Sequence, residues 1–372
     1  MADQFNAARL ERAWELLGRW VDEDRFSAIA AAVGSAHGFE QRAYGRLRPD
    51  RNAAELSPAS IFLIASPTKP VVALAVMSAV DEGLLKLQDP VAAFVPEFAS
   101  QGKRGITLAH LLTHTSGLPD MLPDNTQLRQ KQAPIEAFLQ RTCRLKPDFL
   151  PGRGLQYQSM GFLMLGEVLR RVTGQPIGEV LRRRIFEPLN MQDTALGMPE
   201  AWEVAASGGL SRAERIAEIR TGDTLPFAAT WNTSYWRRFG APWGGLLSTT
   251  GDLARLCQHL LSIHAGESSG IISPAALQAM TTNRLDQFVE VPEPNRRCFA
   301  WGYGWQLNWP GHATTLGDLL SPQAYGHWGA TGTMMWIDPP RDLFSVVLST
   351  EPLENGPRRL ANFSNAVCAA LA

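Results

Sequence analysis

The fold is decided by residues 61–77, which read Ile61-Phe-Leu-Ile-Ala-Ser66-Pro67-Thr68-Lys69-Pro70-Val-Val-Ala-Leu-Ala-Val-Met77. A short apolar run ends at Ser66, a residue type that caps helices well, and Pro67 follows at the first helical position. Apolar residues then recur at helical spacing, and Gly83 is a typical stop signal. The stretch therefore predicts a helix that begins at Ser66 and presents an apolar face.

Ser66 and Lys69 lie three residues apart, so one helical turn places the hydroxyl beside the amine. A serine needs a base to become a nucleophile, and a lysine can serve as that base if burial or a nearby cation lowers its pKa. The apolar flanks supply such burial. We interpret Ser66 as an acyl-forming nucleophile and Lys69 as its immediate partner.

Two other serines compete with this interpretation. Ser-x-x-Lys arises by chance about once in a chain of ordinary composition and this length, and a second copy is present at Ser100–Lys103. Its polar, glycine-containing surroundings indicate a surface loop. Ser268 lies in Gly266-Glu-Ser-Ser-Gly270, the Gly-x-Ser-x-Gly pattern of another hydrolase class, but the strand that this pattern requires before it is replaced by a helical pattern.

Composition narrows the possible functions. The chain has 372 residues, 45% hydrophobic and 19% charged, which is ordinary for a globular protein with a large core. A net charge of -1 gives no reason to expect nucleic acid or an anionic membrane as a partner. No apolar run is long enough to span a bilayer, and the N-terminus lacks a secretory signal, so we expect a cytoplasmic protein of unknown oligomeric state. The four scattered cysteines favour reduced core thiols over a disulfide framework or a zinc site.

Periodicity predicts helices at both ends of the chain and strands next to them. The expected helices near the site or the termini are 7–20, 107–117, 160–172, 250–263 and the segment from 358 onward. The expected strands are 26–33, 40–45, 301–309, 330–337 and 343–350. Both terminal helices are amphipathic and should pack on one antiparallel sheet. His110 and His114 share one face of the helix expected at 107–117, but we interpret them as structural, because no third metal ligand is evident.

Residues 225–245 are dense in aromatic side chains, with Trp231, Trp236 and Trp243 among them. Such a cluster is typical of a core, but the glycine, proline and asparagine around it are typical of loops. Both a core and the wall of a pocket stay open.

Two further stretches belong with Ser66. Tyr157-Gln-Ser159 precedes a helix, and His327-Trp328-Gly329-Ala330 leads into a strand. Together with Ser66-x-x-Lys69, in this order, they resemble the serine β-lactamase-like hydrolases: class C β-lactamases, DD-peptidases and, most closely, the β-lactamase-like (family VIII) carboxylesterases. The resemblance spans nearly the whole chain and includes Leu111-Leu-Thr-His-Thr-Ser-Gly-Leu118.

The resemblance implies a role for each matching residue. Ser66 would be the nucleophile, Lys69 its proton-sharing partner, and Tyr157 the proton shuttle to the leaving group. A phenol with an ordinary pKa near 10 could act as a base only if cations such as Lys69 stabilised its anion. Gly329 and Ala330 fall on the edge strand of the site, and the amides of Ser66 and Ala330 would form the oxyanion hole.

Three departures from the β-lactamase pattern bear on the substrate. Ser159 replaces an asparagine that contacts the substrate's amide, His327 replaces a lysine that binds the β-lactam carboxylate, and Trp328 replaces a threonine. An imidazole is mostly neutral at pH 7, so capture of a carboxylate by charge is weakened. We therefore expect small, uncharged, apolar acyl substrates.

The resemblance implies an α+β fold with an antiparallel sheet flanked by helices. Its sheet subdomain would span 1–90 plus 240–372, and a mostly helical subdomain 91–239. The expected function is carboxylesterase activity through an acyl-Ser66 intermediate, without metal or cofactor, on a small-molecule ester. A β-lactamase, a DD-peptidase, a D-aminopeptidase and a non-catalytic binding module of the same fold remain alternatives. An acidic group near the substrate's amine would indicate the aminopeptidase.

Overall fold

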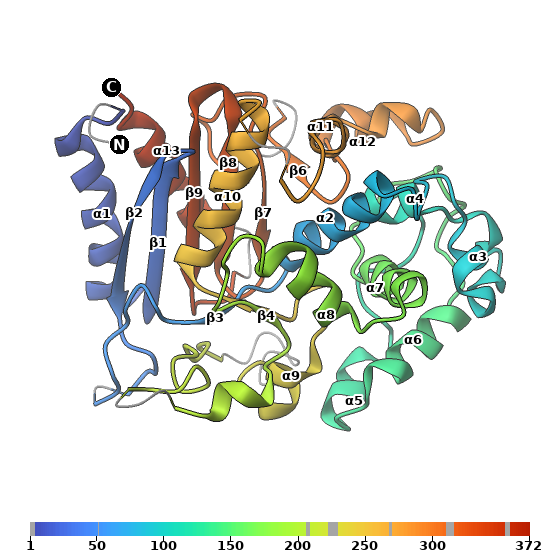
Figure 1. The fold of residues 1–372 in the computed structure, drawn as a ribbon, viewed down its shortest axis with the longest axis horizontal. Helices are drawn as coiled ribbons and strands as arrows, with labels where there is room; N and C mark the ends of the chain where they lie inside the picture. The colour runs from blue at the N-terminus through green and yellow to red at the C-terminus, as the bar shows by residue number, and fades with distance from the viewer. Residues whose placement is uncertain are drawn as a thin grey trace.

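A six-stranded antiparallel sheet joins the two ends of the chain (Figure 1). The computed structural model describes residues 4–50, 52–205, 209–221, 230–267, 270–309, 316–353 and 358–372. Across the sheet the strands are β2 (Gly38–Gly45), β1 (Ala28–Ser35), β9 (Leu343–Ser349), β8 (Thr333–Asp338), β7 (Tyr325–Gly329) and β6 (Gln306–Leu307). The first hairpin thus pairs with the last strand, β1 against β9, so the sheet contains strands from both ends of the chain.

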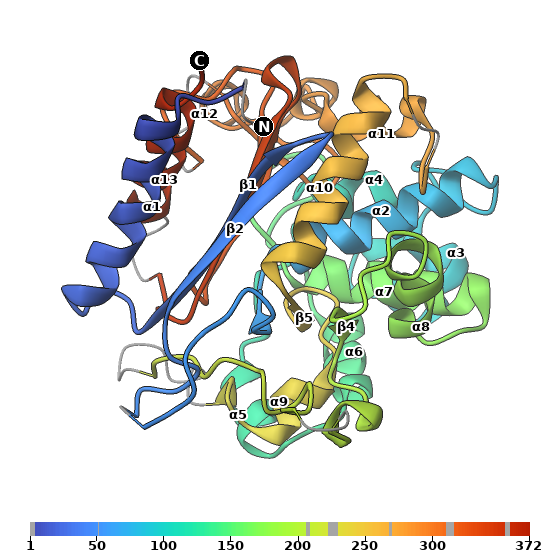
Figure 2. The same ribbon diagram turned by 60° about the vertical axis from the view of Figure 1, so that its left-hand side comes forward.

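Helices cover both faces of this sheet. The terminal helices α1 (Ala7–Asp22) and α13 (Arg358–Ala369) lie side by side on one face, and α10 (Thr250–His264) lies on the other (Figure 2). Leu10, Trp14 and Leu17 are buried in α1, as their spacing predicts, and they form one apolar cluster with side chains of α13 and the sheet. The predicted packing of both terminal helices on one sheet is confirmed.

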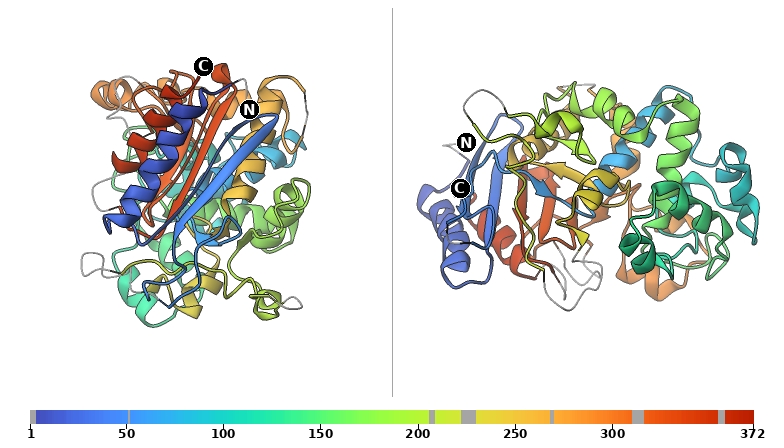
Figure 3. Two further views of the ribbon diagram at one scale, coloured as in Figure 1. Left: turned by 90° about the vertical axis from the view of Figure 1, so that its left-hand side faces the viewer. Right: turned by 90° about the horizontal axis from the view of Figure 1, so that it is seen from below.

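The remaining helices lie beyond one edge of the sheet (Figure 3). They are α3 (Val91–Phe94), α4 (Leu108–Leu112), α5 (Asn125–Gln130), α6 (Ile135–Arg144), α7 (Met160–Thr173), α8 (Ile177–Leu181), α9 (Ser234–Phe239), α11 (Pro274–Thr281) and α12 (Glu293–Cys298). None of the described helices combines the length and apolar character needed to cross a membrane. The subdomain boundaries near residues 90 and 240 stay a prediction.

Helix α2 (Thr68–Asp81) runs between the sheet and these helices (Figure 1). Every residue from Thr68 to Ala79 is buried, so the helix is enclosed on all sides rather than presenting the single apolar face expected from the spacing. Gly83 follows the helix with a φ of 73°, in agreement with the predicted stop. The residues just before α2 are therefore held on a rigid, fully packed element.

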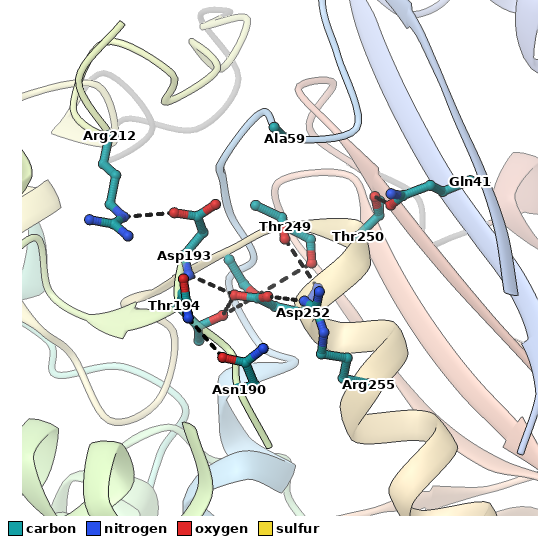
Figure 4. Close-up of polar contacts among 12 residues, drawn as sticks. Gln41, Ala59, Asn190, Asp193, Thr194, Arg212, Thr249, Thr250, Asp252 and Arg255 are labelled. Carbon is teal, nitrogen blue, oxygen red and sulfur yellow. Dashed lines mark hydrogen bonds and ion pairs between the residues drawn. The ribbon is translucent and has the colours of Figure 1, made fainter. Parts of the chain in front are cut away.

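A small second sheet supports the start of α2. It consists of β3 (Phe62–Leu63), β5 (Leu246–Ser248) and β4 (Ala195–Leu196). Beside it, the carboxylate of Asp252, in the first turn of α10, accepts hydrogen bonds from the Asp193 amide and the Thr194 hydroxyl, both 2.8 Å long (Figure 4). Arg255 pairs with the same carboxylate. These contacts fix the segment before β4 against α10 and so help to hold β5.

Several strand predictions are confirmed and one is wrong. The hairpin at 26–45, the strand at 343–350 and the turn that joins it to β8 are present. The strand expected at 301–309 is reduced to Gln306–Leu307, and the one expected at 330–337 begins at Thr333. All four cysteines are free, but Cys298 is exposed rather than in the core.

Candidate active site

A cavity of about 750 Å³ opens in front of Ser66. It brings together every segment that the sequence marks as functional: the turn before α2, the loop before α7, and the end of β7. The predicted site residues that line it are Ser66, Tyr157, Ser159, His327, Trp328 and Ala330. The three sequence motifs therefore meet at one place.

Ser66 lies in the turn that leads into α2. It does not cap the helix: α2 begins at Thr68, no side chain makes a capping hydrogen bond, and the prediction of a serine cap is wrong. Ala65, just before it, has a φ of 53°, which is uncommon for a residue with a Cβ. Strained backbone of this kind persists where the surroundings fix it, as at catalytic turns. The Ser66 hydroxyl therefore makes no capping hydrogen bond to α2.

Lys69 is the buried partner of this hydroxyl. Its Nζ lies 3.1 Å from Ser66 Oγ and donates to the Trp243 carbonyl at 2.9 Å. The side chain is 1% exposed. Burial lowers the pKa of Lys69 to about 8, and the nearby Asp120 carboxylate opposes that shift. A substantial fraction of the amine is therefore neutral near pH 8 and able to accept a proton.

Tyr157 lies against both of these residues. Its phenol hydrogen-bonds to the Ser66 side chain, and Lys69 Nζ lies 4.7 Å from the centroid of its ring. Burial raises the pKa of Tyr157 well above 10; the Asp120 charge adds to the shift and the Ser66 hydrogen bond opposes it. The phenol is thus neutral, and the geometry favours Lys69 as base and Tyr157 as proton donor.

His114 positions the Tyr157 loop, which the sequence did not reveal. Its carbonyl accepts from the Gln156 amide at 2.9 Å, and its Nδ1 accepts from the Gln158 amide at 3.2 Å, one on each side of Tyr157. The His114 ring also packs against the Tyr157 ring, with the two planes tilted by 36°. Helix α4 ends at Leu112, so the prediction that His110 and His114 share a helix face is wrong.

Hydrogen bonds join the residues that follow β7 to the segment that leads to Ser66. Thr331 Oγ1 donates to the Leu63 carbonyl at 2.7 Å, and Thr333 Oγ1 donates to the Ile64 carbonyl at 2.5 Å. A Cβ on Gly329 would lie 2.4 Å from the Ile64 carbonyl oxygen, so only glycine permits this approach. These contacts hold the backbone around Ala330 close to the backbone of Ser66.

His327 and Trp328 occupy neighbouring positions on β7. His327 is 2% exposed, and its Nδ1 donates to the Trp328 carbonyl at 2.8 Å. Burial and the Lys69 charge lower the pKa of His327 to about 3. The imidazole is therefore neutral across the physiological range, as the substitution for lysine suggested. Trp328 lines the cavity as an apolar wall.

Ser159 hydrogen-bonds to the Asp120 carboxylate, which the sequence did not indicate as part of the site. Its Oγ donates to Asp120 Oδ1 at 2.6 Å, and its amide donates to the Asp120 carbonyl at 3.2 Å. Asp120 lines the cavity. No pattern in the sequence links the two residues, which lie 39 positions apart.

The aromatic cluster serves as both core and wall. Trp231, Trp236 and Trp243 are almost fully buried and also line the cavity. The two interpretations left open by the sequence therefore both apply. Phe227, from the same run, lies outside the described residues.

Ser100, the first competing serine, does not have this environment. Ser100, Gln101 and Gly102 are exposed, as predicted for a surface loop, but Lys103 is buried and its Nζ donates to the Ser100 and Leu145 carbonyls. Its amine is used by backbone carbonyls, and the Ser100 hydroxyl donates to the Cys143 carbonyl instead. Ser268 lies outside the described residues, but the segment before it is helix α10, not a strand.

Comparison with known proteins agrees with the fold. The chain is 27% identical to a "Putative D-alanyl-D-alanine carboxypeptidase" of Escherichia coli K12 over 314 residues, 79% of this chain and 69% of that protein. It is 32% identical to "Esterase EstB" of Burkholderia gladioli over 57% of each chain. In fold it is similar to a penicillin-binding protein homologue from Caulobacter crescentus, with a TM-score of 0.78, 23% identity and 98% of each chain covered. The family model for Beta-lactamase matches residues 16–369, and the protein belongs to that family of serine hydrolases.

Proposed function

We propose that the protein is a carboxylesterase that hydrolyses small esters through an acyl-Ser66 intermediate. The observation that carries the proposal is the contact between Ser66 Oγ and the buried amine of Lys69, at 3.1 Å. A lysine whose pKa is lowered to about 8 can take the serine proton near neutral pH. The phenol of Tyr157 adds a proton donor on the same hydroxyl.

Acylation begins when Ser66 Oγ attacks the ester carbonyl and its proton passes to the neutral amine of Lys69. The carbonyl oxygen becomes an oxyanion, which the amides of Ser66 and Ala330 would stabilise; each such donor is typically worth about 3 kcal/mol. The C–O bond to the alcohol then breaks, and Tyr157 donates its proton to the departing oxygen. The Lys69 ammonium returns a proton to Tyr157.

Deacylation repeats these steps with water as the nucleophile. Water attacks the acyl-Ser66 carbonyl, a proton passes to the amine of Lys69, and the bond to Ser66 Oγ breaks as the serine regains its proton. The products are a carboxylic acid and the free enzyme. Neither half of the cycle requires a metal or an organic cofactor.

The cavity walls support a small ester with an apolar portion. Tryptophan side chains from three separate segments, Trp243, Trp301 and Trp328, surround the space in front of Ser66. The neutral imidazole of His327 supplies no charge for a substrate carboxylate. A relative named as an esterase supports the same choice.

Intact-mass spectrometry with a fluorophosphonate probe tests the mechanism. Wild-type protein is expected to gain one probe mass, Ser66→Ala none, and Ser268→Ala one. Hydrolysis of p-nitrophenyl butyrate should follow the same order. Labelling that is retained in Ser66→Ala but lost in Ser268→Ala would contradict the proposal.

A β-lactamase or DD-peptidase activity is the second candidate, because the same residues could form the acyl-enzyme. One observation favours it: the Arg129 side chain, although 2% exposed, is among the residues that line the cavity, and its positive charge favours an anionic group there. Nitrocefin measured beside p-nitrophenyl butyrate separates the two candidates. Efficient nitrocefin turnover with negligible ester cleavage would replace the esterase by this alternative.

A further inference from the structure

The Asp120 carboxylate stands in the cavity wall close to the nucleophile. It lines the same cavity as Ser66 and is partly exposed, and Ser159 holds it by a hydrogen bond of 2.6 Å to Oδ1. Within the described part of the chain, no lysine, arginine or histidine comes within the 4.0 Å of an ion pair with it. The carboxylate is therefore held in place in the cavity wall and is partly exposed to a ligand there.

The charge of Asp120 reaches the reacting groups. It raises the pKa of Lys69 and also that of Tyr157, although burial is the larger cause in each case and acts on the lysine in the opposite direction. Both of these side chains contact Ser66. A ligand cation paired with Asp120 would thus lie near the carbonyl that Ser66 attacks.

The other charged group of the cavity wall is less accessible. Arg129 is 2% exposed, and its guanidinium carbon lies 3.5 Å from the centroid of the Trp236 ring. His327 is neutral. The cavity wall therefore offers the substrate a partly exposed carboxylate, whereas the Arg129 guanidinium, whose charge interacts with that of Asp120, is buried.

We propose that the enzyme favours aminoacyl esters, in which an ammonium group one carbon from the scissile carbonyl pairs with Asp120. This inference rests on the proposed ester hydrolysis and names its substrate class. The ester bond is cleaved by water to an amino acid and an alcohol, through an aminoacyl-Ser66 intermediate. Asp120 is the specificity-determining residue, held by Ser159, and the apolar remainder of the substrate packs on the tryptophans.

A pair of isosteric esters tests the proposal. Alanine ethyl ester and isobutyrate ethyl ester differ by an ammonium group in place of a methyl group, and a pH-stat at pH 7 follows both. The measured quantity is the ratio of their kcat/KM values in wild type divided by the same ratio in Asp120→Asn. The intrinsic activation of the ester by its ammonium group and any general loss of activity cancel in this double ratio.

We expect the double ratio to be about tenfold or more for at least one enantiomer of alanine, as a charge-assisted contact predicts. Asp124→Asn is the matched control, because Asp124 pairs with Arg141 and does not line the cavity. Its double ratio should stay near one. A value near one for Asp120→Asn, or an equal change in Asp124→Asn, would overturn the inference.

A measurement on wild type alone covers the case in which Asp120→Asn does not fold. Alaninamide should inhibit turnover of p-nitrophenyl butyrate with a Ki about tenfold below that of isobutyramide. Equal Ki values would contradict the proposal. Failure of the proposed function is distinct, since Ser66 would then take up no fluorophosphonate and neither ester would be cleaved.

Discussion

The imidazole of His114 packs against the phenol ring of Tyr157, with the ring centroids 4.7 Å apart and the ring planes tilted by 36°. The same residue accepts hydrogen bonds from the backbone amides on both sides of Tyr157. Because a carbonyl and a ring nitrogen of one residue hold both neighbours, the phenol has little freedom to leave Ser66. His114 has a φ of 63°, so its backbone conformation is part of the arrangement.

Replacing His114 should therefore impair catalysis through Tyr157. His114→Ala loses the Nδ1 acceptor and strains the backbone, and we expect kcat for p-nitrophenyl butyrate to fall about tenfold to a hundredfold, with a smaller change in KM. His114→Asn keeps an acceptor near the Nδ1 position and tolerates positive φ. It should recover most of the loss. Equal impairment in both variants would argue against positioning through the Nδ1 contact.

The pH dependence of ester hydrolysis should follow Lys69. Burial lowers its pKa to about 8, so kcat/KM should rise with pH through that value as the amine becomes neutral. The raised pKa of Tyr157 keeps the phenol protonated, so no fall is expected before pH 10.

Asp120→Asn should move this rise to lower pH. The carboxylate favours the charged form of Lys69, and its removal leaves burial unopposed, so the pKa of the amine falls further. The measurement is a pH profile of kcat/KM for p-nitrophenyl butyrate in both proteins, with Asp124→Asn as control. A rise at unchanged or higher pH in Asp120→Asn would show that the titrating group is not Lys69.

The nucleophile and its partner were predictable because a three-residue spacing within one helical turn is local information. The Tyr157 and β7 motifs could be found only through their resemblance to a family, since their contacts with Ser66 join distant segments. Asp120 carries no local signal, and the sequence indicated His114 only as a structural residue, without its link to Tyr157. Each acts through a hydrogen bond to a residue about 40 positions away.

The false strand at 301–309 has a physical cause. Aromatic residues alternate there with glycine and other residues, which imitates the two-residue period of a strand. Gly304, however, has a φ of 83°, and a Cβ at this position would lie 2.3 Å from the Ala73 Cβ of α2. The glycine permits a tight turn against a buried helix, and a tertiary contact of this kind leaves no periodic trace in the sequence.

Substitution of the lysine in each Ser-x-x-Lys copy should have different effects: loss of activity at Lys69 and loss of stability at Lys103. Lys69→Met removes the proposed base, and kcat/KM for p-nitrophenyl butyrate should fall about a thousandfold or more. Lys103→Met leaves the Ser100 and Leu145 carbonyls, in partly buried contacts, without their donor, which should lower the free energy of unfolding by about 1–2 kcal/mol. Its kcat/KM should remain within about twofold of wild type, since Lys103 contacts the Ser100 and Leu145 carbonyls rather than Ser66.

Denaturant unfolding and ester kinetics on both variants check this prediction. A folded Lys103→Met protein with a thousandfold lower kcat/KM would contradict the assignment of the second copy as structural. Retention of activity in Lys69→Met would remove the lysine from the proposed mechanism.

Gly329 tests the contact that brings β7 to the nucleophile. Its Cβ position lies 2.4 Å from both the Ile64 carbonyl oxygen and Thr333 Oγ1, and 2.7 Å from Pro67 Cδ. Gly329→Ala must therefore push the strand away from the turn that carries Ser66. We expect a loss of about 1–3 kcal/mol in stability, as for overpacking elsewhere, together with a larger loss of kcat than the stability change explains.

Gly105→Ala is the matched control, because nothing lies within 4 Å of the Cβ that it would add. It should leave both the unfolding midpoint and kcat near wild type. The decisive comparison is kcat for p-nitrophenyl butyrate at a temperature where both variants are fully folded. The expected loss of kcat follows because moving Ala330 away from Ser66 separates the two amides that would bind one oxygen. If folded Gly329→Ala kept wild-type kcat, the close approach of β7 would matter for packing but not for the oxyanion hole.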